Sequence, residues 1–334
     1  MQNMRAFAGC LAFAVASLAV NAFGATIDYR IIANPGNTAN TNGWGAVTDV
    51  FKMAATETTN SQYAAFLNSV DAAGNKTNGI YNDSMGSNTN GGITFNAGAA
   101  SGSKYSVKSG YESRPVTFVT WFSAARFANW LNNGATGTSS METGAYTLNG
   151  LTSGPIVARN AGAQVFLPSR DQWYKAGFYN GSSYTTWATN SSTTPTNTVT
   201  NLTLANAANY GSAGTPTVGP LAGGSYTNTT SAYGLYDMIG NVTEMTDTIN
   251  TGNSSQYQQF SGNWNISTSN ISQWNATASA RFALGTNNGG ALGFRVAAVP
   301  EPGTIALAGM GIAGLAGLDW MKRRKKRLAA RQTA

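Results

Sequence analysis

The chain lacks histidine entirely, and its only cysteine is Cys10. Without histidine it can form no Ser-His-Asp triad, no histidine general base and no histidine metal site. Because Cys10 lies in the segment interpreted below as a leader, the remaining sequence can form no disulfide and offers no thiol nucleophile or cysteine metal ligand. These absences exclude most common catalytic and metal-binding designs.

Charged residues are also scarce, at 10% of the sequence, compared with about 25% in an average soluble domain. The net charge of +7 is concentrated at the ends, because Arg5 contributes +1 and the tail after Val299, with seven basic and two acidic residues, contributes +5. Residues 26–299 therefore carry a net charge of only +1. We expect no nucleic-acid partner, since nucleic-acid binding needs a basic face.

Glycine and aromatic residues, by contrast, are plentiful. The chain holds 39 Gly, 8 Trp, 14 Tyr and 14 Phe, together with long runs of Asn, Ser and Thr. The aromatic residues are numerous enough to fill a core, so the polar runs indicate long loops and not disorder.

The first residues have the pattern of a secretory signal peptide. Arg5 is followed by an apolar run over residues 6–20 and then by the small residues Ala22, Gly24 and Ala25. This order of a positive charge, an apolar run and a small-residue cleavage site predicts a signal peptide over residues 1–25.

The C-terminal end, residues 300–334, forms a separate unit. Pro300, Glu301 and Pro302 precede an apolar run over residues 303–321 that is interrupted only by Asp319, and residues 322–327 are all basic. A run of about 19 residues nearly crosses the apolar core of a bilayer as a helix, and a basic cluster favours the cytoplasmic side. The sequence therefore predicts a transmembrane helix here and a central domain over residues 26–299.

Three helices are predicted from their capping residues and apolar faces. Thr59 with Gln62, and Ser169 with Gln172, have the spacing of capping boxes, and Thr120 is a typical N-cap. These helices are predicted within residues 57–74, 120–134 and 166–179, and short strands at residues 92–95, 104–107 and 116–119.

Two acids stand close together in residues 234–246, which read GLYDMIGNVTEMT. Asp237 and Glu244 flank a turn in which Gly240 and Asn241 favour positive φ. From these residues alone, Asp237 could be a turn former and Glu244 a solvated strand residue, because a hard cation needs more oxygen ligands than two acids.

This segment resembles the GLYDMxGNVWEW signature of the formylglycine-generating enzyme family, also called the sulfatase-modifying factor domain, with Thr243 in place of tryptophan. Other segments resemble the family in the same order. They are ETTNSQYAAFL (57–67), RPVTFVTWFSAARFANWL (114–131), FLPSRDQWYKA (166–176), FSGNW (260–264) and SARFALGTNNGGALGFRVA (279–297). The resemblance implies an α+β, loop-rich fold related to C-type lectins, with few helices and short, twisted antiparallel strands.

The resemblance also implies one metal site. By this resemblance, the carboxylates of Asp237 and Glu244 and the backbone carbonyls of Gly240 and Val242 in this chain would bind Ca²⁺. Hard oxygen ligands around a glycine turn suit this ion.

Formylglycine generation in the family needs a pair of cysteines that hold copper, located between the GGSW-like and GFR segments. The corresponding interval, residues 265–292, contains no cysteine, and hydroxyl groups are poor ligands for copper(I). We therefore expect no copper and no formylglycine chemistry. The groove could persist as a binding surface, lined by Trp264, Trp274 and Arg281.

The tail resembles the PEP-CTERM sorting signal of Gram-negative exopolysaccharide producers. Pro300, Glu301 and Pro302 would form its sorting motif, which implies recognition by an exosortase-type membrane protease. The protein would be anchored in the inner membrane until the tail is removed, and would then reach the cell surface or the extracellular matrix.

The sequence favours an exported, non-catalytic module that binds a surface polysaccharide or a peptide, or that has a structural role. One alternative is an oxidoreductase of the sulfatase-modifying factor superfamily. Another is a hydrolase that acts on surface polymers with two of the acids Asp237, Glu244 and Asp247, since paired carboxylates can cleave glycosidic bonds.

Overall fold

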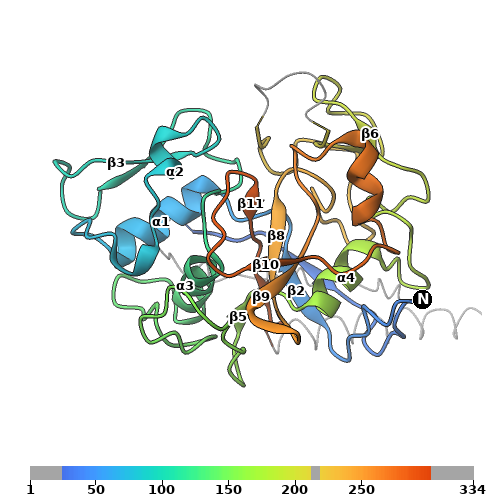
Figure 1. Cartoon of the computed structure of the whole chain (residues 1–334), viewed down its shortest axis with the longest axis horizontal. Helices are drawn as coiled ribbons and strands as arrows, with labels where there is room; N and C mark the ends of the chain where they lie inside the picture. The colour runs from blue at the N-terminus through green and yellow to red at the C-terminus, as the bar shows by residue number, and fades with distance from the viewer. Residues whose placement is uncertain (1–24, 212–218, 302–334) are drawn as a thin grey trace, which may run out of the picture.

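The computed structural model describes residues 25–211 and 219–301. Two small four-stranded sheets organise this part of the chain (Figure 1). The first is antiparallel throughout and joins the beginning of the domain to its end. Its order is β1 (Tyr29–Ile32), β2 (Phe51–Ala54), β12 (Ala297–Ala298) and β5 (Val165–Phe166).

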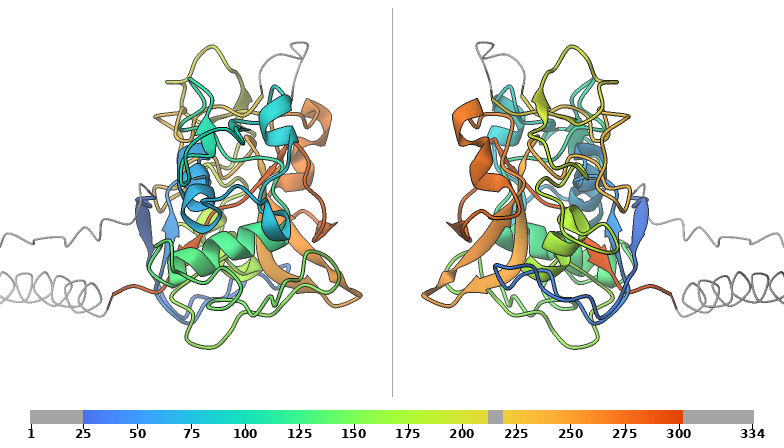
Figure 2. Two further views of the ribbon diagram at one scale, coloured as in Figure 1. Left: turned by 90° about the vertical axis from the view of Figure 1, so that its left-hand side faces the viewer. Right: turned by 90° about the vertical axis from the view of Figure 1, so that its right-hand side faces the viewer.

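The second sheet is built around a long hairpin formed by β8 (Thr243–Asn250) and β9 (Asn253–Phe260). β10 (Phe282–Leu284) pairs with the outer side of β9, and β11 (Leu292–Gly293) runs parallel to β8. The turn of the hairpin projects at one edge of the molecule (Figure 2). Two further strand pairs are β3 (Ile93–Phe95) with β4 (Tyr105–Val107), and β6 (Thr196–Asn197) with β7 (Ala207–Ala208).

Three helices of nine or more residues begin at the predicted caps. They are α1 (Asn60–Val70), α3 (Trp121–Asn132) and α4 (Arg170–Phe178), and each has a complete capping box at its N-terminus. Shorter turns are η1 (Thr77–Gly79), α2 (Ser84–Ser87) and η2 (Thr268–Trp274). Helices α1 and α3 lie on one side of the β8–β9 hairpin, and α4 and η2 lie on the other (Figure 1).

Aromatic side chains fill the core between these elements, as the composition predicts. Phe127 of α3 packs against Tyr63 and Phe66 of α1 and against Phe294 beside β11, with ring centroids 5.4 to 5.8 Å apart. On the other side of the hairpin, Trp173 of α4 stacks on Phe260 of β9 at 4.6 Å. Burial of rings of this size is the main source of stability in a fold with so little regular structure.

One predicted strand is wrong. Residues 116–119 run as irregular chain, because Phe118 adopts a φ of 60° and turns the backbone away from an extended course. Val116 donates instead to the carbonyl of Thr58 at 2.8 Å. The strands predicted at residues 92–95 and 104–107 are confirmed as β3 and β4.

Several predictions concern residues that are not described. The signal peptide lies outside the described ranges except for Ala25, and the predicted transmembrane helix and Pro302 lie outside them altogether. Within residues 25–211 and 219–301, none of the helices has the length and apolar character needed to span a bilayer. Pro300 is buried, and Glu301 forms an ion pair with Lys52 of β2.

Candidate functional site

The segment between Asp237 and Glu244 forms a tight turn that leads into β8. Asp237, Gly240 and Asn241 have φ values of 56°, 82° and 57°, so the predicted positive φ at Gly240 and Asn241 is confirmed. A side chain at Gly240 would also meet the carbonyl oxygen of Asn209, because an added Cβ would lie 2.3 Å from it. The turn therefore requires glycine at this position. It directs Glu244 into the interior.

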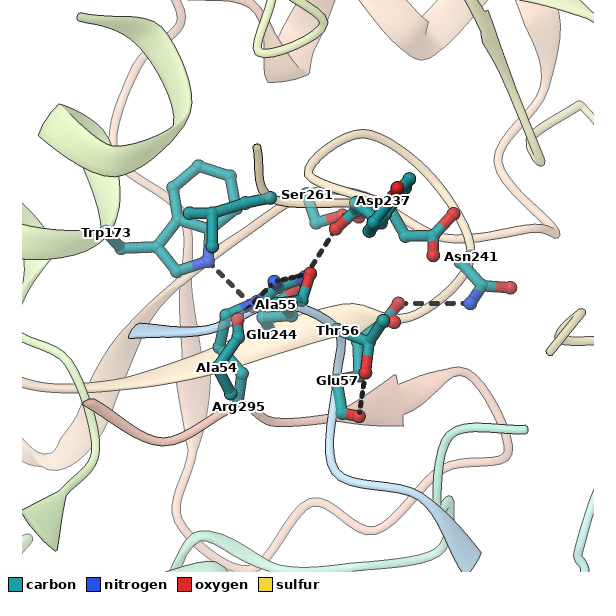
Figure 3. A network of polar contacts seen from close by, with 12 residues as sticks. Ala54, Ala55, Thr56, Glu57, Trp173, Asp237, Asn241, Glu244, Ser261 and Arg295 are labelled. Carbon is teal, nitrogen blue, oxygen red and sulfur yellow. Dashed lines mark hydrogen bonds and ion pairs between the residues drawn. The ribbon is translucent and has the colours of Figure 1, made fainter. Parts of the chain in front are cut away.

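Glu244 is fully buried and forms a bidentate ion pair with Arg295 (Figure 3). Nε and Nη2 of Arg295 each donate to a different oxygen of the carboxylate at 2.6 Å, and the indole nitrogen of Trp173 donates to Oε2 at 2.8 Å. A buried charge is tolerated when its partner and remaining hydrogen bonds are supplied in this way. Glu244 is therefore an interior residue that links β8, α4 and the chain after β11.

Two further acids surround this ion pair. Glu57 accepts a hydrogen bond from the amide nitrogen of Asn241 at 3.1 Å, while its Oε2 atom is buried and has no partner. Burial, and then the nearby charge of Asp237, raise the pKa of Glu57 well above its usual value. Burial also raises the pKa of Asp237 to about 6, although the backbone N–H of Gly224 partly opposes this. Burial therefore opposes the charged form of both carboxyl groups beside the ion pair.

Two of the four predicted calcium ligands, Glu244 and Gly240, already have partners inside the protein. Both oxygens of Glu244 face Arg295 and Trp173, and the carbonyl of Gly240 accepts from the hydroxyl of Ser261 at 2.9 Å. In the described residues, no cluster of three or more Asp, Glu, His or Cys side chains could hold a metal ion. The Arg295 guanidinium thus takes the place beside the Glu244 carboxylate that a metal cation would occupy.

A polar groove lies on the outer side of the sheet that contains β8, β9 and β10. It consists of two hollows of about 580 and 730 Å³, and both are lined by Gln259, Gln273 and Arg281. η2, β10 and the β8–β9 hairpin follow one side of the molecule there (Figure 2). Amide side chains dominate the first hollow, which is also lined by Asn263, Asn265, Asn270 and Asn287. Arg281 is the only charged residue among the described residues that line either hollow.

The structure brings together two of the three predicted binding residues. Trp274 and Arg281 line the first hollow, and the guanidinium carbon of Arg281 lies 4.8 Å from the centroid of the Trp274 ring. Trp264 lines neither hollow, and its indole nitrogen is buried without a hydrogen-bond partner. Sequence reasoning missed Gln259, which lies on β9 outside the interval used to predict the groove.

Thr243, which departs from the family signature, also lines the groove. Its hydroxyl accepts a hydrogen bond from the amide nitrogen of Asn263 at 2.9 Å. Much of the remaining lining comes from residues 265–292, which contain neither cysteine nor methionine. Because copper(I) requires soft sulfur ligands, these hydroxyl and amide groups do not fit a copper site.

Comparison with known proteins agrees with this architecture. A family model described as the sulfatase-modifying factor enzyme 1-like domain matches residues 32–299, and one described as the PEP-CTERM protein-sorting motif matches residues 298–325. No curated protein sequence matches the chain.

Solved structures of other proteins share the fold, and two of them illustrate it. Treponema denticola variable protein 1 superposes with a TM-score of 0.50 and 19% identity, covering 81% of this chain and 95% of its own. The crystal structure of CarF superposes with a TM-score of 0.51 and 19% identity, covering 83% of this chain and 99% of its own. At these identities the likeness concerns the fold alone.

Proposed function

The chain belongs to the family of sulfatase-modifying factor enzyme 1-like domains and carries a PEP-CTERM sorting motif, and from that premise we propose that it is an exported, non-catalytic binding module for a polysaccharide outside the cell. The sorting motif implies export and processing by an exosortase. We further propose that the processed protein reaches the cell surface or the extracellular matrix.

The observation that carries this proposal is the chemistry of the groove. Gln259, Gln273 and four asparagines present amides that can both donate and accept hydrogen bonds. The hydroxyl groups of a sugar have the same double capacity, so an amide-rich surface can satisfy them. The open hollows, unlike an enclosed cavity for a small ligand, suit a chain that continues beyond the contact region.

The same lining argues against catalysis in the groove. Hydrolysis of a glycosidic bond needs two carboxyl groups that flank the bond, whereas none of the described lining residues is acidic. Glu244 is held by Arg295 in the interior. Oxidation of a cysteine substrate would need thiols that residues 265–292 do not contain.

Binding can be measured by isothermal titration calorimetry of the full chain with polysaccharide extracted from the matrix of the producing cells. The informative variant is Gln273→Ala in the groove, and the matched control is Gln164→Ala. Both glutamines are exposed, and the side chain of each makes one local hydrogen bond, to Asn270 and to the Gly162 carbonyl respectively.

We expect Gln273→Ala to weaken binding by about two- to tenfold, as for the loss of one neutral hydrogen bond, and Gln164→Ala to leave the affinity unchanged. Absence of binding by the wild-type chain, or equal affinities for both variants and wild type, would contradict the proposed site.

A further inference from the structure

Arg281 is distinguished from most other arginines by the absence of an acidic partner. The described ranges contain seven arginines, and five of them have a carboxylate oxygen within 4.0 Å. The exceptions are Arg114, which lies over the ring of Tyr111 at 4.2 Å, and Arg281. Only Arg281 lines the groove. Its positive charge is therefore uncompensated at the surface proposed to bind a ligand.

The indole of Trp274 holds the Arg281 side chain in place. Trp274 is only 9% exposed and packs closely against Gly262, where an added Cβ would lie 3.1 Å from the indole Cγ. The guanidinium lies over the Trp274 ring, an arrangement stabilised by cation–π attraction. Trp274 is thus a support for Arg281, and the guanidinium is the group left available to a ligand.

The donors of Arg281 are largely unused. Its Nε atom makes one long hydrogen bond of 3.4 Å to the carbonyl of Gln273, and its Nη1 and Nη2 atoms make none to any residue in the described ranges. A planar guanidinium with two free terminal nitrogens matches the two oxygens of a carboxylate.

Gln259 supplies a second group beside this cation. Its backbone N–H donates to the carbonyl of Arg281 at 2.9 Å. Arg281 directly precedes β10, and the antiparallel register of β10 with β9 continues to place it opposite Gln259, so the two side chains share a face. The Oε1 atom of Gln259 is buried without a hydrogen-bond partner in the described structure. A buried acceptor without a donor lowers stability, and a turn of the Gln259 side chain into the hollows that it lines would let a ligand hydroxyl donate to this oxygen.

We propose that the groove recognises an acidic polysaccharide, with Arg281 binding the carboxylate of a uronic acid and Gln259 accepting a hydrogen bond from a neighbouring sugar hydroxyl. This inference rests on the proposed function and specifies its ligand. Neutral polymers satisfy the amides but leave the charge of Arg281 without a partner.

The test compares polygalacturonate with the same polymer after reduction of its carboxyl groups to neutral hydroxymethyl groups, so that only the charge differs. Affinities of the full chain for both polymers are measured by isothermal titration calorimetry at low and high salt. The variants are Arg281→Gln, Arg281→Lys and, as a matched control, Arg114→Gln, which also removes an arginine that rests on an aromatic ring without an acidic partner.

We expect wild type to bind polygalacturonate at least tenfold more tightly than the reduced polymer, with an affinity that falls as salt rises. Arg281→Gln should remove this preference, Arg281→Lys should restore part of it because the charge remains without the planar fork, and Arg114→Gln should behave as wild type.

Three results would overturn the inference. If wild type binds both polymers equally while Gln273→Ala weakens both, the proposed function stands and the acidic ligand is wrong. If polyglutamate binds as tightly as polygalacturonate, the site recognises carboxylates without regard to sugar. If neither polymer binds and matrix polysaccharide does not bind either, both the inference and the proposed function fail.

Discussion

Arg295 uses all of its donors inside the protein. Its five N–H groups reach both oxygens of Glu244 and the carbonyls of Ala54, Ala55 and Tyr236. One side chain thereby fixes the end of β2, the turn before β8 and the start of β8. The family signature marks Glu244 in the sequence, but its partner lies 51 residues away and nothing in a single sequence pairs the two.

Removing one member of the Glu244–Arg295 ion pair should lower the free energy of unfolding, whether or not calcium is present. We predict that Glu244→Gln lowers the free energy of unfolding by about 3–5 kcal/mol, because Arg295 would remain buried without its counter-charge. Asp83→Asn is a suitable control, since the Asp83 side chain is 83% exposed in its pair with Lys76 and such pairs contribute about 1 kcal/mol or less.

Urea unfolding with added calcium and with a chelator measures the effect of each substitution and the effect of calcium on stability. We expect the wild-type curve to be the same in the two conditions. A calcium-dependent increase in stability that Glu244→Gln abolishes would instead restore the predicted role of Glu244 as a metal ligand.

Asp237, which is half-buried, and Asp247, whose side chain is 6% exposed, predict an unusual dependence of stability on pH. Burial raises the pKa of Asp237 and of Asp247 to about 6, from an ordinary value of 3.8. Between about pH 4 and pH 6 the folded protein therefore binds more protons than the unfolded chain, so its stability falls as the pH rises through this window. Each aspartate contributes up to about 3 kcal/mol to this fall.

Asp237→Asn should reduce the pH dependence, because the asparagine is neutral throughout and its amide oxygen can still accept from the Gly224 N–H. Chemical unfolding at a series of pH values measures it. A wild-type stability that is flat or rising between pH 4 and pH 6 would show that these carboxyl groups are not buried as described.

Among the secondary-structure elements, the starts of the helices could be predicted from the sequence, whereas most strand pairings could not. The caps at Thr59, Thr120 and Ser169 act on the backbone three residues ahead, so the information is local and visible in the sequence. Strands such as β5, β11 and β12 are two residues long. They are too short to show an alternating pattern, and their partners are set by tertiary contacts.

The segment that lines the groove carries a prediction about chemistry. Residues 265–292 supply hydroxyls and amides but no sulfur, so we expect no oxidation of cysteine to formylglycine. Incubation of the protein with copper and a cysteine-containing sulfatase peptide, followed by mass spectrometry, measures this. An aldehyde in place of the peptide thiol would show that the missing cysteines are not required.

For the whole molecule, the family and its fold could be recognised from motifs in the correct order, and two of the three predicted groove residues line a hollow. Trp274 and Arg281 were predicted because they lie inside the interval between the GGSW-like and GFR segments. Gln259 reaches the same groove only because β9 pairs with β10. Trp264, although close in sequence, does not line it, since sequence proximity does not determine the direction of a side chain.

The thiol-free groove is the proposed binding site for polysaccharide. Hydrogen–deuterium exchange of the full chain, with and without saturating matrix polysaccharide, tests it most directly because backbone amides report contact along the whole described structure. We predict slower exchange in peptides that cover β9, η2 and β10, and unchanged exchange in α1 and in β3–β4. Protection confined to other segments, or bound polysaccharide without protection in the groove, would show that the polysaccharide binds elsewhere.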